Sequence, residues 1–209
     1  MNSANTASKT AEDANTKFAK ALEQRFTRLQ DEYLQGEPSA KATLAQLRRG
    51  LGKPVGSSPK AWELTVKAVP DELGGNPHWP SREEQAAYAA FTLYALHQQS
   101  LTTGAHERGV SFGKAVQRLR STWSEAAVTR RFTAVSTAET IDEVLVHMRG
   151  LVSQFRAAQQ SLDYVRLAFD LRDLLKPARA ASVRLAWGRD FYRTEKDDDN
   201  NPAGGITNE

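Results

Sequence analysis

Residues 109–113 read Gly-Val-Ser-Phe-Gly, which fits the G-x-S-x-G pattern of the nucleophile elbow in serine hydrolases. In that motif the serine hydroxyl attacks an acyl carbon, so Ser111 is the first candidate for chemistry. The elbow requires a strand before the serine and a helix after it, because the strained turn between them projects the hydroxyl. Its triad also requires an acid and then a histidine further along the chain.

The context of Ser111 argues against a hydrolase. Residues 101–109 are polar and interrupted by glycine, with none of the alternation of a strand. His147 is the only downstream histidine, and it lies inside a helical pattern. We instead expect Ser111 to cap the helix that follows, while Gly109 and Gly113 permit a tight turn and a close backbone approach. We expect no catalytic residue.

Other residue types that carry chemistry are sparse. The chain has no cysteine, which excludes disulfides and thiolate sites and favours a reducing cytoplasm. The four histidines lack the spacing of metal ligands, and we expect His97 and His106 to be ordinary surface residues. No Gly-rich phosphate loop is present. The sequence therefore predicts a protein without enzymatic activity, metal or cofactor.

Helical periodicity runs along most of the chain. Apolar residues recur three and four positions apart, as in Phe18, Leu22 and Phe26. Convincing strand patterns are missing. We expect an all-α fold, a bundle of about eight or nine helices in two closely packed lobes and no sheet.

The predicted organisation has four parts. Composition predicts a flexible N-terminal segment at 1–14, lobes at 15–104 and 105–193, and a disordered acidic tail at 194–209. The N-terminal residues lack the apolar core of a signal peptide, and no apolar run reaches membrane-spanning length. We therefore expect a cytoplasmic location.

Several serines and prolines mark helix starts. Ser81 and Glu84 fit the capping-box pattern S-x-x-E. Pro59 and Pro177 fit the first turn of a helix, where the missing N–H costs nothing. The helix after Pro59 is expected to bury Val66. The serines expected to cap helices are Ser39, Ser58, Ser81, Ser111 and Ser124.

The net charge of +3 conceals an uneven distribution. Residues 194–209 hold one lysine against five carboxylates, so they carry −4 and the rest of the chain carries +7. Residues 108–131 hold six basic side chains against Glu125 alone, a local charge of +5. Such a local excess indicates a polyanionic partner such as nucleic acid. A basic helix face that is merely solvated is the alternative.

Arginines scattered over several helices fit a surface that follows phosphates. Guanidinium groups offer forked donors and keep their charge when partly desolvated. Such a surface ignores base identity. The candidate nucleic-acid-binding residues are Lys114, Arg130, Arg131, Arg149, Arg48, Arg49, Arg118, Arg179 and Arg184.

With these residues assembled, the chain resembles the CasB family, the small subunit of the type I-E CRISPR surveillance complex Cascade. The resemblance covers most of the body up to Tyr192. The segments that carry it, in order, are LRR at 47–49, SFGKA at 111–115, RRF at 130–132 and LDY at 162–164.

The resemblance implies a non-catalytic helical subunit of a ribonucleoprotein in antiviral defence, which binds RNA and DNA. It implies that the subunit stabilises the heteroduplex of CRISPR RNA and target DNA, and the displaced non-target strand of the R-loop. The family's basic contacts would fall on Lys114, Arg130, Arg131, Arg149 and the pair Arg48 and Arg49, and less closely on Arg179 and Arg184. Implied partners are the other Cascade subunits and a second copy packed head to tail. A helical protein–protein adaptor without nucleic-acid contact is the alternative function.

Overall fold

A computed structural model describes residues 2–193, and the predicted acidic tail at 194–209 lies outside the described residues. In the described part the chain forms nine α-helices and two short 3-10 helices, η1 (Asp71–Leu73) and η2 (Leu119–Ser121), with no strand. The predicted all-α fold is therefore confirmed. The α-helices are α1 (Asn2–Leu34), α2 (Pro38–Arg49), α3 (Pro59–Ala68), α4 (Arg82–His97), α5 (Phe112–Arg118), α6 (Glu125–Thr137), α7 (Ile141–Ala158), α8 (Tyr164–Leu174) and α9 (Pro177–Tyr192).

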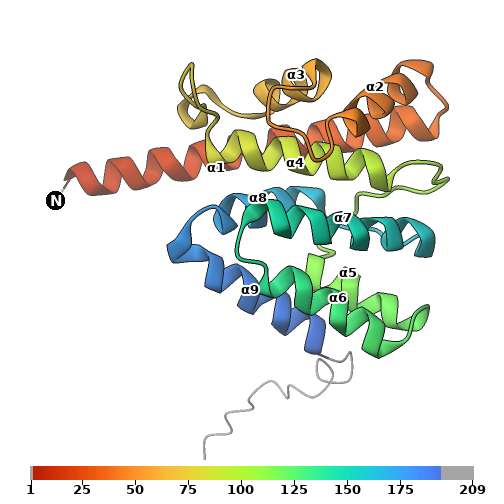
Figure 1. Cartoon of the computed structure of the whole chain (residues 1–209). Helices are drawn as coiled ribbons and strands as arrows, with labels where there is room; N and C mark the ends of the chain where they lie inside the picture. The colour runs from red at the N-terminus through yellow and green to blue at the C-terminus, as the bar shows by residue number, and fades with distance from the viewer. Residues whose placement is uncertain (1, 194–209) are drawn as a thin grey trace, which may run out of the picture.

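The helices are arranged around α4 (Figure 1). On one side α4 packs against α2 and α3, with α1 behind them, and on the other side it packs against α7 and α8. Farther from α4, α5 packs against α9 and α6 packs against α7. The predicted boundary at 104 and 105 falls in the loop between α4 and α5. The division into two lobes stays a prediction, because α4 contacts both groups of helices.

Helix α4 is buried on all sides. Its small residues, including Ala86, Ala87 and Ala90, have almost no exposed surface, so neighbouring helices approach its backbone closely. Ser81 and Glu84 form the predicted capping box: Ser81 Oγ accepts the Glu84 N–H at 3.0 Å, and Glu84 Oε2 accepts the Ser81 N–H at 2.6 Å. A helix that is apolar all round belongs in the centre of a bundle.

Two details of the predicted helices are wrong. Helix α2 begins at Pro38 with Glu37 as its N-cap, rather than after Ser39, because a proline at the first helical position loses no backbone hydrogen bond. Val66 is 48% exposed, since α3 presents Ala61, Thr65 and Ala68 to the core instead. The other predicted caps stand at their positions, although the Ser58 hydroxyl donates to the Gln46 carbonyl and leaves the start of α3 without a side-chain cap.

Helix α1 begins at Asn2, inside the segment 1–14 that the sequence predicts to be flexible. From Ala14 onward its apolar stripe is buried, including Phe18, Leu22 and Phe26. The first turns therefore continue an anchored helix, and their mobility in solution stays a prediction.

The prediction that His97 and His106 are surface residues is wrong. His97 ends α4 with 0% exposure, and its Nδ1 lies 3.0 Å from Tyr164 Oη. His106 is 7% exposed, and its Nδ1 accepts the backbone N–H of Tyr164 at 3.1 Å. That bond assigns the imidazole proton to Nε2, which donates to Glu23 Oε2 at 3.3 Å. Both rings are covered because α8 packs against the end of α4 and the loop that follows it.

We expect His97 to make the fold less stable in mild acid. Burial is the main reason that the pKa of His97 falls from 6.5 to about 4. Between these values the unfolded chain binds a proton that the folded chain does not bind, so acidification favours unfolding. Lowering the pH from 7 to 5 should reduce the free energy of unfolding by about 2 kcal/mol through this residue alone.

The matched variant is His97→Asn, which cannot titrate and keeps a polar atom near Tyr164. Asp170 acts in the opposite direction, because burial raises its pKa to about 6 and its protonation favours the folded state as the pH falls. Urea unfolding of both proteins at pH 7 and pH 5 separates the two effects, since Asp170 is present in each. The wild type should lose about 2 kcal/mol more than the variant. If both proteins lost the same free energy of unfolding between pH 7 and pH 5, His97 would not be buried in its neutral form.

Candidate nucleic-acid interface

The Gly-Val-Ser-Phe-Gly segment forms the start of α5. Ser111 is its N-cap, and Ser111 Oγ accepts the Lys114 N–H at 3.2 Å, so the predicted capping role is confirmed. Gly109 has a φ of +84°, which glycine adopts without strain. At Gly113 a Cβ atom would lie 2.3 Å from the Trp187 carbonyl oxygen, so α5 and α9 meet backbone to backbone. The pattern that resembles a nucleophile elbow thus forms a helix start and a helix contact.

Residues 162–164 hold this turn in place. The Asp163 N–H donates to the Val110 carbonyl at 2.8 Å, and the Asp163 carboxylate accepts the Gly109 N–H at 2.8 Å. The same carboxylate accepts the Arg166 N–H at 2.9 Å and so caps α8. Two of the segments that carry the family resemblance, SFGKA and LDY, therefore adjoin each other through the turn at 109–110.

Helix α5 carries Lys114 and Arg118. Both residues are half-buried, with Lys114 in the first turn of the helix and Arg118 at its last residue. Helix α5 also packs against α6 and α7. The turn at Ser111 therefore fixes the start of the helix that carries Lys114, and this helix packs against the two helices that carry the next candidates.

Three of the predicted residues lie on the adjoining helices α6 and α7. Arg130 and Arg131 are exposed on α6, and Arg149 is exposed on α7, which packs against α6. Arg131 Nη1 lies 3.6 Å from the position that a Cβ on Gly150 would occupy. The Arg131 guanidinium therefore lies over α7 at Gly150, the residue that follows Arg149 in the chain. We call Arg130, Arg131 and Arg149 the basic face.

At the end of α2, Arg49 is exposed and Arg48 is half-buried, donating to the Ala95 carbonyl at 3.4 Å. Burial lowers the pKa of Arg48, and the positive charge of Arg156 on α7 lowers it further. Arg156 therefore lies near Arg48, and it follows Arg149 by seven residues on the same side of α7. Its Nη1 donates to Gln99 Oε1 at 3.1 Å, so Arg156 joins α7 to the segment that follows α4. The sequence prediction did not include it. The two-turn spacing from Arg149 is the signal that reveals it.

Arg179 and Arg184 on α9 are not brought to the basic face. Arg179 lies 3.5 Å from the Asp173 carboxylate. Arg184 is half-buried and donates to the carbonyl of Ala138, the C-cap of α6, at 2.6 Å. Both guanidinium groups therefore make structural contacts, and their predicted role on phosphates remains the least supported of the set.

The candidate residues on α5, α6 and α7 differ from the other basic residues in their surroundings. Within residues 12–193, neither a carboxylate nor another side-chain partner holds the charged groups of Lys114, Arg118 and the basic face. By contrast, the arginines that lie in ion pairs are Arg28, Arg108, Arg120, Arg166, Arg172 and Arg179. Exposed guanidinium groups without a carboxylate are suited to bind phosphate oxygens.

The described residues offer little for other chemistry. They contain no group of three or more His, Asp or Glu side chains placed to hold a metal ion. None of the helices between residues 2 and 193 combines the length and the apolar character needed to span a bilayer. The expected lack of a cofactor stays a prediction.

Comparison with known proteins identifies the family. Residues 43–192 match the family model for CRISPR-associated protein Cse2. The CRISPR-associated protein Cse2 of Thermus thermophilus is 28% identical over 159 residues, which are 76% of this chain and 83% of that protein. CasB from Thermobifida fusca, known from a crystal structure, is 34% identical with a TM-score of 0.69, covering 84% of this chain and 98% of that one.

A chain of a CRISPR RNA-guided surveillance complex has the same fold. It is 19% identical, with a TM-score of 0.59 over 83% of this chain and 95% of its own length. The family match extends from within α2 to the last residue of α9 and so includes every candidate nucleic-acid-binding residue. This chain belongs to the Cse2 (CasB) family of CRISPR-associated proteins.

Proposed function

We propose that this chain is a non-catalytic subunit of a CRISPR RNA-guided surveillance complex of the Cascade type, acting in cytoplasmic antiviral defence. In that complex it stabilises the heteroduplex of CRISPR RNA and target DNA, together with the displaced strand. Its partners are these nucleic acids, the other Cascade subunits and a second copy packed head to tail. The observation that carries the proposal is the basic face, three exposed arginines on adjoining helices without a carboxylate beside them.

The energetics of strand exchange suit such a subunit. A heteroduplex of RNA and DNA is about as stable as the DNA duplex that it replaces, so R-loop formation is nearly balanced. A modest contribution from contacts to the backbone is then enough to shift the equilibrium. Each lysine or arginine on a phosphate releases counterions, which makes the affinity fall as the salt concentration rises. A rigid helical surface can supply these contacts without reading the sequence.

The test is a triple charge reversal, Lys114→Glu, Arg130→Glu and Arg131→Glu, in the assembled complex. We expect the affinity for target DNA to fall by about 10- to 100-fold, and the slope of log affinity against log salt to decrease by about three. Gel shift at several salt concentrations measures both quantities. The variant should keep the helical content and the urea midpoint of the wild type, because no hydrogen bond or ion pair within residues 12–193 holds the three replaced charged groups.

The matched control reverses three exposed basic residues of α1, α2 and α4, Lys20, Lys41 and Arg82, and so changes the net charge equally. This control should bind target DNA within about twofold of the wild type at physiological salt, because the charges lie away from the proposed contacts. Normal R-loop formation by the first triple variant would mean that the site assignment is wrong. If in addition the wild-type chain alone shows no salt-sensitive retention on heparin, a helical adaptor becomes the better description.

A further inference from the structure

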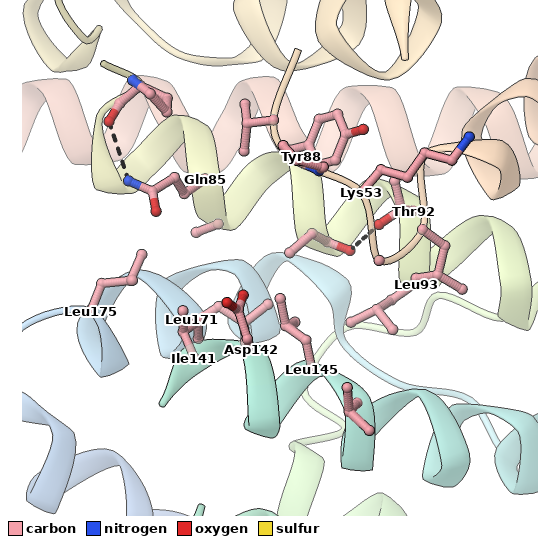
Figure 2. Close-up of a pocket in the computed structure, with 18 of the residues that line it drawn as sticks. Lys53, Gln85, Tyr88, Thr92, Leu93, Ile141, Asp142, Leu145, Leu171 and Leu175 are labelled. Atoms are coloured by element: carbon pink, nitrogen blue, oxygen red, sulfur yellow. Dashed lines mark hydrogen bonds between the residues drawn. The ribbon is translucent and has the colours of Figure 1, made fainter. Parts of the chain in front are cut away.

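A cavity of about 1010 Å³ lies between the helices of the first half of the chain and those of the second half. Figure 2 shows Leu93 of α4 on one side of this hollow, with Leu145 of α7 and Leu171 of α8 on the other. The loops at 51–55 and 78–80 contribute the rest of the wall. Its volume matches the upper end of the ~300–1,000 Å³ range of ligand pockets. The cavity is therefore large enough and apolar enough to take a flat ring system.

Trp79 in the wall of this cavity is unusually exposed. Its residue exposure is 75%, the highest among the large hydrophobic residues that the structure describes as exposed. Its backbone is nevertheless held firmly, because Asn76 Oδ1 accepts the N–H groups of both His78 and Trp79 at 2.9 Å. A Cβ on Gly75 would stand 2.3 Å from the Trp79 carbonyl oxygen, so only glycine allows this tight turn. The fold thus presents an indole ring to solvent on a fixed loop.

Cationic side chains stand at the same cavity. Arg149 lines it and also belongs to the basic face, and Arg131 lies over the following residue of α7, Gly150. Lys53 lines it from the loop after α2 and, within the described residues, has no carboxylate partner. Asp142 is the only carboxylate in the wall. Arg149 therefore belongs both to the basic face and to the wall of an apolar hollow, and Lys53 adds a second positive charge from the loop after α2.

We propose that this cavity takes one unstacked base of a single-stranded nucleic acid, stacked on Trp79, with the adjoining phosphates on Arg149 and Lys53. The inference rests on the proposed function, since the strand reaches the cavity along the basic face. Aromatic rings stack on any base, and cations follow the backbone, so the combination binds single strands without reading their sequence. A duplex cannot use the site, because its bases are stacked and paired inside the helix.

Binding of the full chain to fluorescein-labelled DNA, followed by anisotropy, tests the proposal. Trp79→Ala should weaken binding of a single-stranded oligonucleotide by roughly 5- to 150-fold, the range for loss of one stacked base. It should leave the affinity for the duplex of the same sequence and the salt slope unchanged, since the phosphate contacts remain. Trp79→Phe should retain most of the affinity. An abasic strand of equal length should bind the wild type no better than the normal strand binds Trp79→Ala.

The possible failures can be told apart. Wild-type chain that binds neither single strands nor duplex would overturn the proposed function and the base site together. Wild-type chain that binds salt-sensitively, with Trp79→Ala equal to it on single strands, would overturn the base site and leave the proposed function standing. Equal losses on single strand and duplex would also overturn the base site, because they would show that Trp79 does not distinguish a free base from a paired one.

Discussion

Replacing Arg172 with alanine should destabilise the fold by about 3–5 kcal/mol, the usual cost of removing one partner from a buried ionic network. Arg172 is 7% exposed on α8. Its Nη1 donates to Asn15 Oδ1 at 2.7 Å, and its Nε donates to Asp173 Oδ1 at 2.8 Å and lies 3.9 Å from Glu83 Oε1. One guanidinium thereby joins α8 to α1 and α4. Without it, two carboxylates with little access to water would face each other.

The size of this effect depends on Lys176, which lies 3.9 Å from Glu83 and 3.8 Å from Asp173 and can partly replace the lost charge. We therefore expect a value near the lower end of the range. The matched control is Arg179→Ala, which removes an exposed partner of the same Asp173 and should cost no more than about 1 kcal/mol. Urea unfolding at pH 7 compares the two variants. Equal destabilisation would show that the buried network contributes no more than a surface pair.

The sequence predicted the features that depend on neighbours along the chain. The capping box at Ser81, the cap at Ser111 and the apolar stripe that includes Met148 and Phe155 are local patterns, and the structure confirms them. Such patterns depend on backbone hydrogen bonding and on helical spacing, which a few consecutive residues determine. That is why the all-α fold could be predicted without any knowledge of the packing.

Features that depend on packing between distant segments could not be predicted. His97 ends a helix that looks amphipathic, and only the arrival of Tyr164, 67 residues later, buries it. The arginines show the same limit, because the sequence does not reveal that Asp173 neutralises Arg179 or that Arg184 completes the end of α6. Residue type marked these side chains as candidates for phosphate binding. Their surroundings in the fold decide which of them remain available.

The exposure of Trp79 could not be predicted from the sequence, because Trp79 lies in an irregular segment where helical periodicity does not apply. Residues 70–81 contain so many prolines and glycines that the sequence predicts no regular structure there, and the structure forms only η1 and an isolated bridge between Asn76 and Trp79. Periodicity says nothing about a side chain outside a helix. The cavity beside Trp79 arises only when α7 and α8 pack below α4, so neither the exposed ring nor its cationic neighbours could be recognised as a site from the sequence.

The second large effect is expected at Gly113, the last residue of the Gly-Val-Ser-Phe-Gly segment. Gly113→Ala would place a Cβ 2.3 Å from the Trp187 carbonyl oxygen and 2.9 Å from the Asp190 Cβ. The first of these atoms belongs to the backbone of α9, so no side-chain rotation relieves the contact and the two helices must separate. Overpacking of this kind costs about 3 kcal/mol when a helix has to move. We expect a loss of that size in the free energy of unfolding.

Two further variants, one at a glycine and one at the capping serine, isolate the cause. Gly188→Ala, on α9 beside the same contact, meets no atom within 4 Å, and should leave stability unchanged or raise it by up to about 1 kcal/mol because alanine favours a helix. Ser111→Ala removes only the cap of α5 and should cost about 1 kcal/mol. If Gly113→Ala unfolds in urea like Gly188→Ala, the close contact of α5 and α9 is wrong. We therefore expect Gly113→Ala to lower the free energy of unfolding most. In this G-x-S-x-G segment the last glycine fixes the distance between α5 and α9, whereas the serine contributes a single capping hydrogen bond.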